Sequence, residues 1–289
     1  MFDVATLPKR ENAHYPGIDI VFDDEKHRYE VNGEKFPSVT TIVGKHYSKD
    51  AIAHWVERKT LEGVCQMQKW VDAGDSPSLP RDVETFRAAL YAEGLTADQE
   101  KERKGAIGCE THGAFEGYIK TGRIPKLGEL ENQEAREYVA AVGRALLEID
   151  ATFPVSEVLV ASLRHKYAGR FDAVMEVQTR SEVNFAVTQD GRIERRYLEV
   201  GRYLIDLKTA NNIYPEVGMQ LAGYAQAAYE CGFGTFKGLL AFHLQEHGDY
   251  AVHQFKHQRG DFAALAKLYH RHLAAAKRRT RANKALEAA

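Results

Sequence analysis

The sequence predicts a mixed α/β (α+β) fold, in which a central mixed β-sheet is flanked by helices. Three observations support this prediction. Apolar residues recur at helical spacing through much of 49–149, strand-like segments joined by turns fill 156–208, and an amphipathic helix separates these from further strands. No Gly-rich phosphate loop follows a strand, so a doubly wound nucleotide-binding fold is not expected.

Residues 1–100 are expected to form an N-terminal hairpin and a helical elaboration. Residues 18–32 alternate between apolar and polar side chains around a turn, which predicts two short strands. Ser38 or Thr40 is a suitable N-cap for the helix that follows. Further helices are predicted by their apolar spacing at 49–70, at 83–121 in two pieces, and at 131–149, with a Pro- and Gly-rich loop at 72–82.

Residues 101–260 are expected to hold the core, followed by a basic helix at 261–289, all in one structural unit. Strand, turn and strand are predicted from Ser156 to Gln178, and a polar hairpin with Asp190-Gly191 at its tip comes next. The remaining elements are a strand at 202–210, a helix at 215–232 and strands at 237–244 and 250–255.

Composition sets wide limits on the function. A chain of 289 residues suits one large domain, and its net charge of -2 does not indicate a uniformly basic nucleic-acid binder. Its cysteines, Cys65, Cys109 and Cys231, form no C-x-x-C pair, so neither a zinc ribbon nor an iron–sulfur cluster is expected. With no signal peptide and no apolar run of about 20 residues, we expect a cytoplasmic protein without a membrane partner.

The segment Asp206-Leu207-Lys208 is the first candidate for chemistry. It ends the predicted strand YLIDLK, in which residues two apart point to the same face. Asp206 and Lys208 therefore project together with Leu204, while Ile205 and Leu207 face the other side. A charged pair on an apolar strand requires compensation by pairing or by a metal. An ordinary ion pair on an edge strand would also explain it.

Further polar residues accompany this segment. Asp172 follows Gly169, which we expect in a turn, and enters a core strand. Glu157 begins the preceding strand, and strand–turn–strand geometry would bring it near Asp172. Gln220 and Tyr224 lie four residues apart and share one face of a predicted helix.

In this order the residues resemble the PD-(D/E)xK nuclease superfamily, and in particular its RecB-like exonuclease branch with its phage and mitochondrial genome-maintenance members. The branch pattern G-x-x-D, D/E-x-K and Q-x-x-x-Y is matched at 169–172, 206–208 and 220–224, and His112 matches a histidine on an earlier helix. The resemblance spans roughly residues 20–250 and implies a restriction-endonuclease-like core. The long interval between Asp172 and Asp206 and the absence of iron–sulfur cysteines depart from the pattern.

The resemblance implies a role for each matched residue. Asp172, Asp206 and the Leu207 carbonyl would bind Mg²⁺ or Mn²⁺, and His112 would bind or support the ion. Lys208 would orient or deprotonate the attacking water. The remaining members, which would complete the site or position the reacting groups, are Glu157, Gln220 and Tyr224. Beside a metal and in a buried setting, the pKa of Lys208 is expected to be lowered.

DNA is the expected partner. The segment RHKYAGR leads into Asp172 and offers Arg164, Lys166, Tyr167 and Arg170 as DNA contacts. The basic C-terminal helix could also bind phosphates, or it could be a solvated tail. A helicase, a recombinase or a single-strand-binding protein is a further expected partner, because nucleases of this branch often work beside such proteins.

Three other hypotheses stay open at this stage. The chain could be an inactive DNA-binding or protein-interaction module of the same fold, although a decayed site should have lost a charge from Asp172, Asp206 or Lys208. It could be a structure-specific or restriction-like endonuclease, which would nick closed circles. Finally, the D-x-K segment could be a coincidence in an unrelated α+β protein. Among these the sequence favours a Mg²⁺-dependent exonuclease acting in DNA recombination, repair or phage DNA processing.

Overall fold

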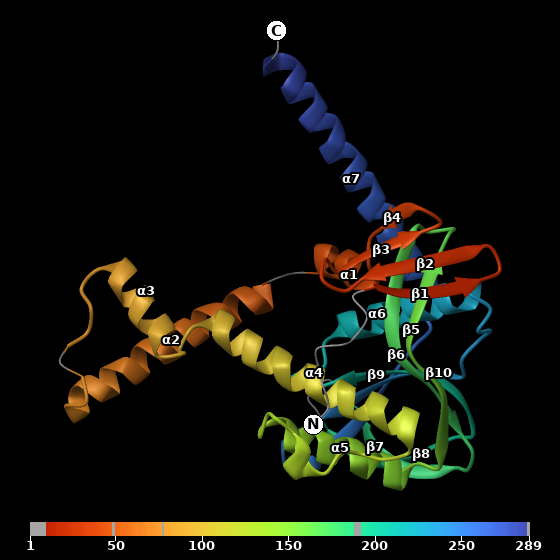
Figure 1. Ribbon diagram of the computed structural model, residues 1–289, viewed down its shortest axis with the longest axis horizontal. Helices are drawn as coiled ribbons and strands as arrows, with labels where there is room; N and C mark the ends of the chain where they lie inside the picture. The colour runs from red at the N-terminus through yellow and green to blue at the C-terminus, as the bar shows by residue number, and fades with distance from the viewer. Residues whose placement is uncertain (1–9, 48–49, 77, 188–191, 288–289) are drawn as a thin grey trace.

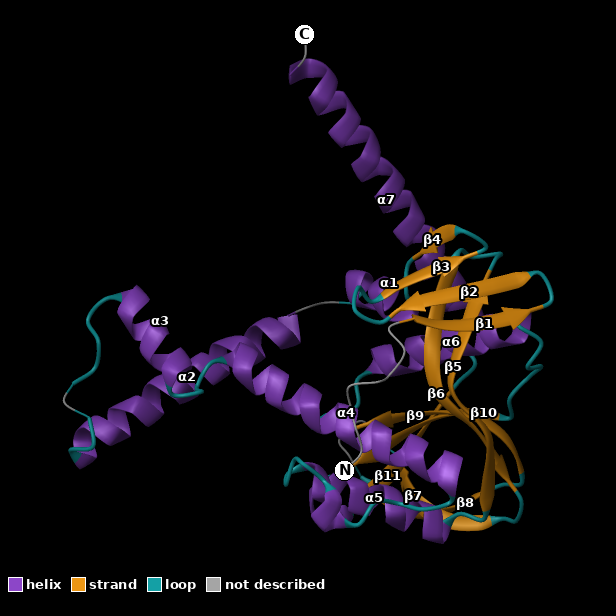
Figure 2. Ribbon diagram, in the orientation of Figure 1, coloured by secondary structure: helices purple, strands orange, loops and turns teal. Residues whose placement is uncertain are grey.

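The computed structural model describes residues 10–47, 50–76, 78–187 and 192–287 and confirms a mixed α+β architecture. Within these residues lie a seven-stranded and a four-stranded sheet with helices packed around them (Figures 1 and 2). None of the described helices is both long and apolar enough to span a membrane.

The seven-stranded sheet is mixed and has the order β5-β6-β9-β10-β11-β7-β8. Strands β9 and β10 are parallel, as are β11 and β7, while the other neighbours are antiparallel. The strands are β5 (Ala151–Ser162), β6 (Tyr167–Val177), β7 (Ser181–Ala186), β8 (Ile193–Leu198), β9 (Gly201–Lys208), β10 (Gly238–Leu244) and β11 (Tyr250–Phe255).

The predicted polar hairpin is present as β7 and β8, but it does not lie beside the strand that precedes it in the sequence. Strand β7 pairs with β11 at the opposite edge from β5, and β9 takes the place next to β6. Its expected tip, Asp190-Gly191, lies outside the described residues.

Helices cover both faces of this sheet. On one face, α1 (Val39–His46), α6 (Pro215–Glu230) and the start of α7 (Arg259–Glu287) share a hydrophobic cluster with β5 and β6. On the other face, α4 (Ala97–Thr121) and α5 (Ala135–Glu148) pack on β9 and β10. Leu204 belongs to the first cluster and Ile205 and Leu207 to the second, which confirms the predicted facing of β9.

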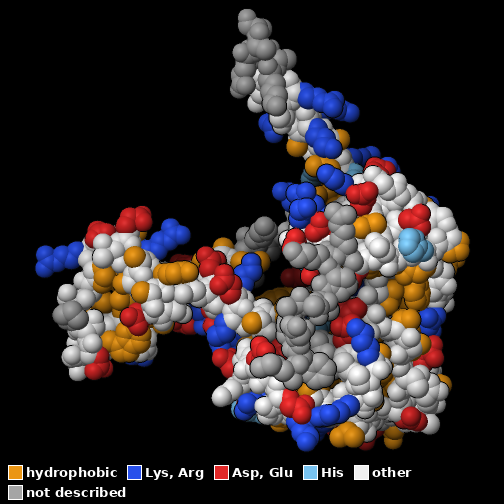
Figure 3. Space-filling view, in the orientation of Figure 1, with side chains coloured by type: hydrophobic (Ala, Val, Ile, Leu, Met, Phe, Trp, Pro, Cys, Tyr) orange, Lys and Arg blue, Asp and Glu red, His pale blue; other side chains and the backbone are white. Residues whose placement is uncertain are grey.

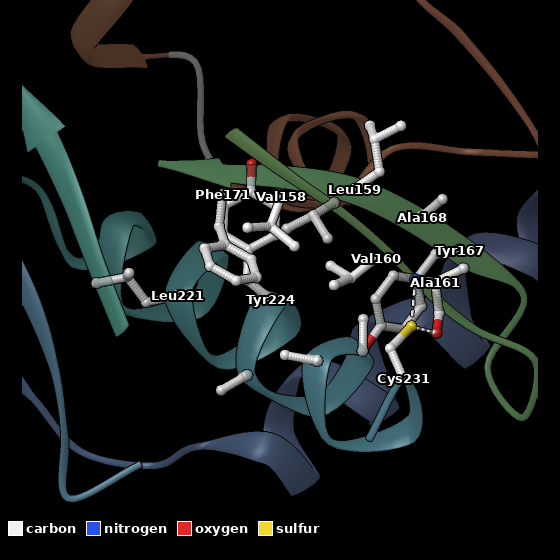
Figure 4. Packing of buried hydrophobic residues seen from close by; sticks show 14 of the residues in the cluster. Val158, Leu159, Val160, Ala161, Tyr167, Ala168, Phe171, Leu221, Tyr224 and Cys231 are labelled. Carbon is white, nitrogen blue, oxygen red and sulfur yellow. Dashed lines mark hydrogen bonds between the residues drawn. The ribbon is translucent and has the colours of Figure 1, made fainter. Parts of the chain in front are cut away.

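The packing between α6 and the β5–β6 hairpin is dense (Figure 4). Phe171 from β6 and Leu221 from α6 are fully buried there, and Tyr224 lies beside them. Burying one such large side chain contributes roughly 1.5–3 kcal/mol. This packing fixes α6 over the middle of the sheet, and with it the face that carries Gln220 and Tyr224.

Side-chain caps set several helix boundaries. The Ser38 hydroxyl accepts a hydrogen bond of 2.9 Å from the Thr41 amide and confirms the predicted N-cap of α1. Thr96 forms a capping box with Gln99 at the start of α4, and Gly122 ends that helix in the left-handed conformation. The predicted break near residue 93 is also present, between α3 (Val83–Ala92) and α4.

The N-terminal segment forms a complete antiparallel sheet in the order β1-β2-β3-β4. The predicted hairpin is β2 (Ile18–Asp23) and β3 (Arg28–Val31), and the sequence did not indicate its neighbours β1 (Arg10–Tyr15) and β4 (Glu34–Phe36). Its inner side chains belong to the same hydrophobic cluster as β5, β6 and α6. The core is therefore continuous across residue 100.

Two helical segments extend away from this core. Helix α2 (Asp50–Ala73) and α3 form an arm that meets the body through α4, and the C-terminal part of α7 projects in another direction (Figure 1). Every residue of α7 from Arg271 to Asn283 is exposed.

Candidate metal centre

Asp172 lies in the middle of β6 and is 8% exposed. The paired residues of β6 and β9 end at Ala173 and Ile205, and beyond this point the Asp172 side chain continues the bonding between the strands. Its Oδ2 accepts a 2.5 Å hydrogen bond from the Leu207 amide. The carboxylate is thus fixed at the end of the ladder, facing the strand that carries Asp206 and Lys208.

Glu157 lies opposite Asp172 on β5, between the pairs Ser156–Ala173 and Val158–Phe171. Its backbone is left-handed, with a φ of 49°, in the middle of a strand. Such a conformation costs about 1–2 kcal/mol for a residue with a Cβ, and strained residues of this kind cluster at functional sites. Burial, and then the nearby Asp172 carboxylate, raise the pKa of Glu157 to about 7.

His112 reaches the same place from α4. Its Nδ1 lies 3.5 Å from Asp172 Oδ2. One ligand atom from each of His112, Glu157 and Asp172 lies within 4.8 Å of the other two. The structure therefore brings together three predicted site residues from three different elements.

A divalent cation fits this arrangement. Two carboxylates and an imidazole are ligands that Mg²⁺, Mn²⁺ and other divalent ions accept, with carboxylates favouring the harder ions. The Asp172 carboxylate contributes to the raised pKa of Glu157, and a cation between the two carboxylates would relieve this repulsion.

Asp206 and Lys208 form the second half of the site. Asp206 is 2% exposed, and its Oδ2 lies 2.5 Å from Lys208 Nζ. Gln220 Nε2 donates to Asp206 Oδ1 over 3.4 Å and to the Tyr224 hydroxyl over 3.2 Å. Asp206, predicted as a metal ligand, does not belong to the group of three residues whose ligand atoms lie within 4.8 Å of one another; its carboxylate contacts Lys208 and Gln220. Binding of a cation by the Leu207 carbonyl stays a prediction.

The expected lowering of the Lys208 pKa depends on a bound metal ion, and the surrounding residues alone shift this pKa in the opposite direction. Burial alone would lower the pKa, but the Asp206 and Asp172 carboxylates outweigh burial and raise it. Burial also raises the pKa of Asp206, and Lys208 opposes this effect. Lys208 is therefore a protonated ammonium at neutral pH, held against a carboxylate.

Gly169 does not form the turn expected of it. It lies within β6, and the turn is made by residues 163–166. A Cβ at Gly169 would stand 2.5 Å from Tyr224 Cε1 and 3.2 Å from Val39 Cγ2. The glycine is needed because the Tyr224 ring packs directly on the strand, so the G-x-x-D and Q-x-x-x-Y segments interlock.

A network that sequence analysis missed supports Glu157. Arg170 Nε lies 2.9 Å from Glu157 Oε2, and its Nη1 lies 3.1 Å from Glu11 Oε1 on β1. The guanidinium also stacks over the Phe22 ring at 5.2 Å. The N-terminal sheet thus reaches the candidate site through one arginine. The sequence analysis named Arg170 only as a DNA contact, and nothing in the sequence indicated Glu11.

Of the four predicted DNA contacts, two are buried or partly buried and two are exposed. Tyr167, predicted as a DNA contact, is fully buried, and its hydroxyl donates to the Gly223 carbonyl. Arg170 is partly buried between two carboxylates, which makes it a positioning residue. Arg164 and Lys166 are exposed on the β5–β6 turn, with Lys166 paired to Glu34.

Comparison with known proteins finds no matching protein-family model and no significantly similar curated protein. The residues of the site and their arrangement are therefore the grounds for assigning a function.

Proposed function

We propose that the protein is a divalent-metal-dependent DNA nuclease of the RecB-like branch of the PD-(D/E)xK superfamily. One observation carries the proposal: His112, Glu157 and Asp172 offer ligand atoms within 4.8 Å of one another, and Asp172 lies on β6, the strand next to β9 with its Asp206–Lys208 pair. A cluster of three potential metal ligands, a lysine and a hydrogen-bonded glutamine together suit phosphodiester hydrolysis better than they suit an ordinary structural ion pair.

His112, Glu157 and Asp172 would hold Mg²⁺ or Mn²⁺, with Asp206 at the border of the site. Such an ion lowers the pKa of water and stabilises negative charge on phosphate oxygens. The close approach of the Glu157 and Asp172 carboxylates to each other and to His112 is the feature of this chain that favours binding of a cation.

Lys208 would act as a donor and a positive charge. The carboxylates around it keep it protonated, so its ammonium can orient the attacking water and neutralise charge that develops on the scissile phosphate. Glu157 would hold the ion as an ionised carboxylate, so its raised pKa of about 7 in the metal-free protein predicts that metal binding weakens as the pH falls below neutral. Gln220 donates hydrogen bonds to both Asp206 and Tyr224 and would hold the Asp206 carboxylate beside Lys208.

An exonuclease acting in DNA recombination, repair or phage DNA processing is the form of the activity that the resemblance favours. A helicase, a recombinase or a single-strand-binding protein would then be a natural partner. Endonuclease activity and DNA binding without cleavage are the rival outcomes.

The test uses end-labelled linear DNA, single- and double-stranded, with a covalently closed circle as the control substrate. Wild type is compared with Lys208→Met and with Lys237→Met, a surface lysine that donates to the Val200 carbonyl. We expect Mg²⁺- or Mn²⁺-dependent loss of linear DNA, a decrease of at least about 100-fold in Lys208→Met, and no change in Lys237→Met. Nicking of the circle would make the protein an endonuclease, and a folded wild type that cleaves nothing would refute the nuclease.

A further inference from the structure

A basic groove lies between the β5–β6 turn and α7, away from the candidate metal centre. It has a volume of about 640 Å³. Its cationic residues are Arg164 and Lys166 on the turn and Lys267 and Arg271 on α7, and alanines of α7 complete its wall. No Asp or Glu lines it. The small wall residues allow a ligand to approach α7 closely between the cationic side chains.

The groove is held open by specific contacts. His270 Nε2 lies 3.0 Å from the Lys166 carbonyl and 3.2 Å from the His165 carbonyl, which ties α7 to the turn. Phe262 anchors the start of α7, because it is fully buried and packs edge-on against the Tyr167 ring at 4.8 Å. The two basic walls therefore keep a fixed separation.

Its cations are available to a ligand. Arg164, Lys267 and Arg271 form no ion pair with any acid among the described residues, whereas Lys166 is paired with Glu34. A charged side chain that is simply solvated at the surface needs no partner. Three unpaired cations around one groove, however, create a local positive potential in a chain whose net charge is -2.

The positive potential continues along α7. From Phe262 to Leu286 the sequence contains seven Lys or Arg residues and no Asp or Glu. Lys267, Arg271, Arg278 and Arg281 follow helical spacing and share one side of the helix. This row extends over about 21 Å at 1.5 Å per residue. Figure 3 shows Lys and Arg side chains gathered along this projecting helix.

We infer that the groove and the row on α7 bind the phosphodiester backbone of duplex DNA outside the catalytic site. This inference rests on the proposed nuclease function and adds a second contact to it. Lys166 is the last residue of the turn before β6, and Asp172 follows it by six residues, so the groove lies up to about 20 Å from the metal centre at 3.3 Å per residue. DNA longer than about six base pairs can reach both places.

A membrane surface is a less suitable partner. A helix that lies in a membrane interface needs a continuous apolar face with bulky or aromatic side chains. Beyond Arg271 the only large apolar residues of α7 are Leu273 and Leu286, and no aromatic residue is present. The remaining small residues are alanines, which leave the helix polar on every side.

The experiment measures binding of a 30-base-pair duplex in chelator, where no cleavage occurs. The groove variant is Arg164→Gln/Lys267→Gln/Arg271→Gln in the full chain. The matched control, Arg123→Gln/Arg180→Gln/Arg196→Gln, removes the same charge from other surfaces. At 100 mM salt we expect the groove variant to bind at least about 10-fold more weakly, with a slope of log K against log salt shallower by about 2–3. The control should stay within about 2-fold of wild type, since its three arginines lie outside the groove.

Equal losses in the two variants would overturn the inference, because the effect would then be one of overall charge. Binding of wild type to phosphatidylserine vesicles but not to duplex DNA would replace it with a membrane contact. A tetranucleotide substrate, too short to reach the groove, separates this inference from the proposed function. If wild type cleaves neither the tetranucleotide nor longer DNA but still binds the duplex through the groove, the nuclease is refuted and the DNA-binding groove stands.

Discussion

Glu157 combines a left-handed backbone, a buried carboxyl and a pKa near 7. In an unfolded chain its pKa would be close to 4.5. The folded protein therefore holds this proton more tightly than the unfolded chain. The resulting stability is fully present below pH 4.5 and is lost as the pH rises through about 7.

Glu157→Gln should therefore stabilise the protein at pH 8 when chelator is present. We expect a gain of roughly 1–3 kcal/mol in the free energy of unfolding at pH 8, and most of this gain should be absent at pH 5. Urea unfolding at the two pH values measures it. A variant less stable than wild type at pH 8 would show that the fold does not disfavour the ionised form of Glu157.

Glu148→Gln is the matched control with the opposite sign. Burial raises the pKa of Glu148, but hydrogen bonds from Tyr250, Arg144 and Arg195 lower it by more. Removing this carboxylate should destabilise the protein at pH 8, and the loss should shrink as the pH falls below 4.5.

At the residue scale, the sequence located most of the site but not its geometry. Strand alternation predicted that Asp206 and Lys208 project together, and helical spacing predicted that Gln220 and Tyr224 share a face. Their gathering with Asp172 and His112 in one site was an expectation from the family resemblance. The left-handed conformation of Glu157 was not predictable, because no local pattern marks it within a strand. The contact of Arg170 with Glu11 was not predictable either, because it joins two separate sheets. The burial of Tyr167 was not predicted, because an aromatic residue in a basic segment can equally belong to the core or to a binding surface.

At the element scale, contact between Gly169 on β6 and Tyr224 on α6 holds the two motif-bearing elements together. Gly169→Ala places a methyl group 2.5 Å from a ring carbon of a buried tyrosine. We expect a loss of about 1–3 kcal/mol in the free energy of unfolding, typical of overpacking. In Gly169→Ala/Tyr224→Leu the cost of the alanine should be smaller than in wild type, which a double-mutant cycle measures.

Gly105→Ala provides the control for this substitution. Gly105 lies on an exposed turn of α4, where an added Cβ meets nothing within 4 Å. Alanine there should stabilise the protein by about 0.5–1 kcal/mol through helix propensity. Equal effects at positions 105 and 169 would contradict the interlocking of β6 and α6.

The elements themselves were largely predictable, and their arrangement was less so. Alternation, helical spacing and capping residues predicted the β2–β3 hairpin, α1, the break before α4 and the strands around the site. The placement of β7 and β8 at the far edge was not predictable, because local patterns carry no information about which strands become neighbours. For the same reason β1 and β4, which are short and polar, were missed.

At the scale of the whole molecule, α7 is divided into an anchored start and a free end. Phe262 and Ala266 are fully buried, whereas residues 271–283 are all exposed. Removing residues 275–289 should therefore change the melting temperature by less than about 2 °C, while Phe262→Ala should cost about 3–5 kcal/mol in the free energy of unfolding. A large destabilisation on truncation would mean that the exposed half of α7 packs against the body.

The N-terminal sheet belongs to the same core as the candidate site. Glu11 on β1 holds Arg170, and Arg170 holds Glu157. The seven-stranded sheet supplies the acids and the lysine, α4 the histidine and α6 the glutamine. The site therefore depends on the complete core, because no single segment contains it.

The central claim is that His112, Glu157 and Asp172 bind a divalent metal. Calorimetric titration of Mn²⁺ into wild type, Asp172→Asn and the control Glu148→Gln at pH 7.5 tests it most directly. We predict binding to wild type and to Glu148→Gln with similar affinity, and a loss of at least about 10-fold in Asp172→Asn. No binding to wild type, or equal binding to Asp172→Asn, would contradict the metal centre and with it the proposed nuclease.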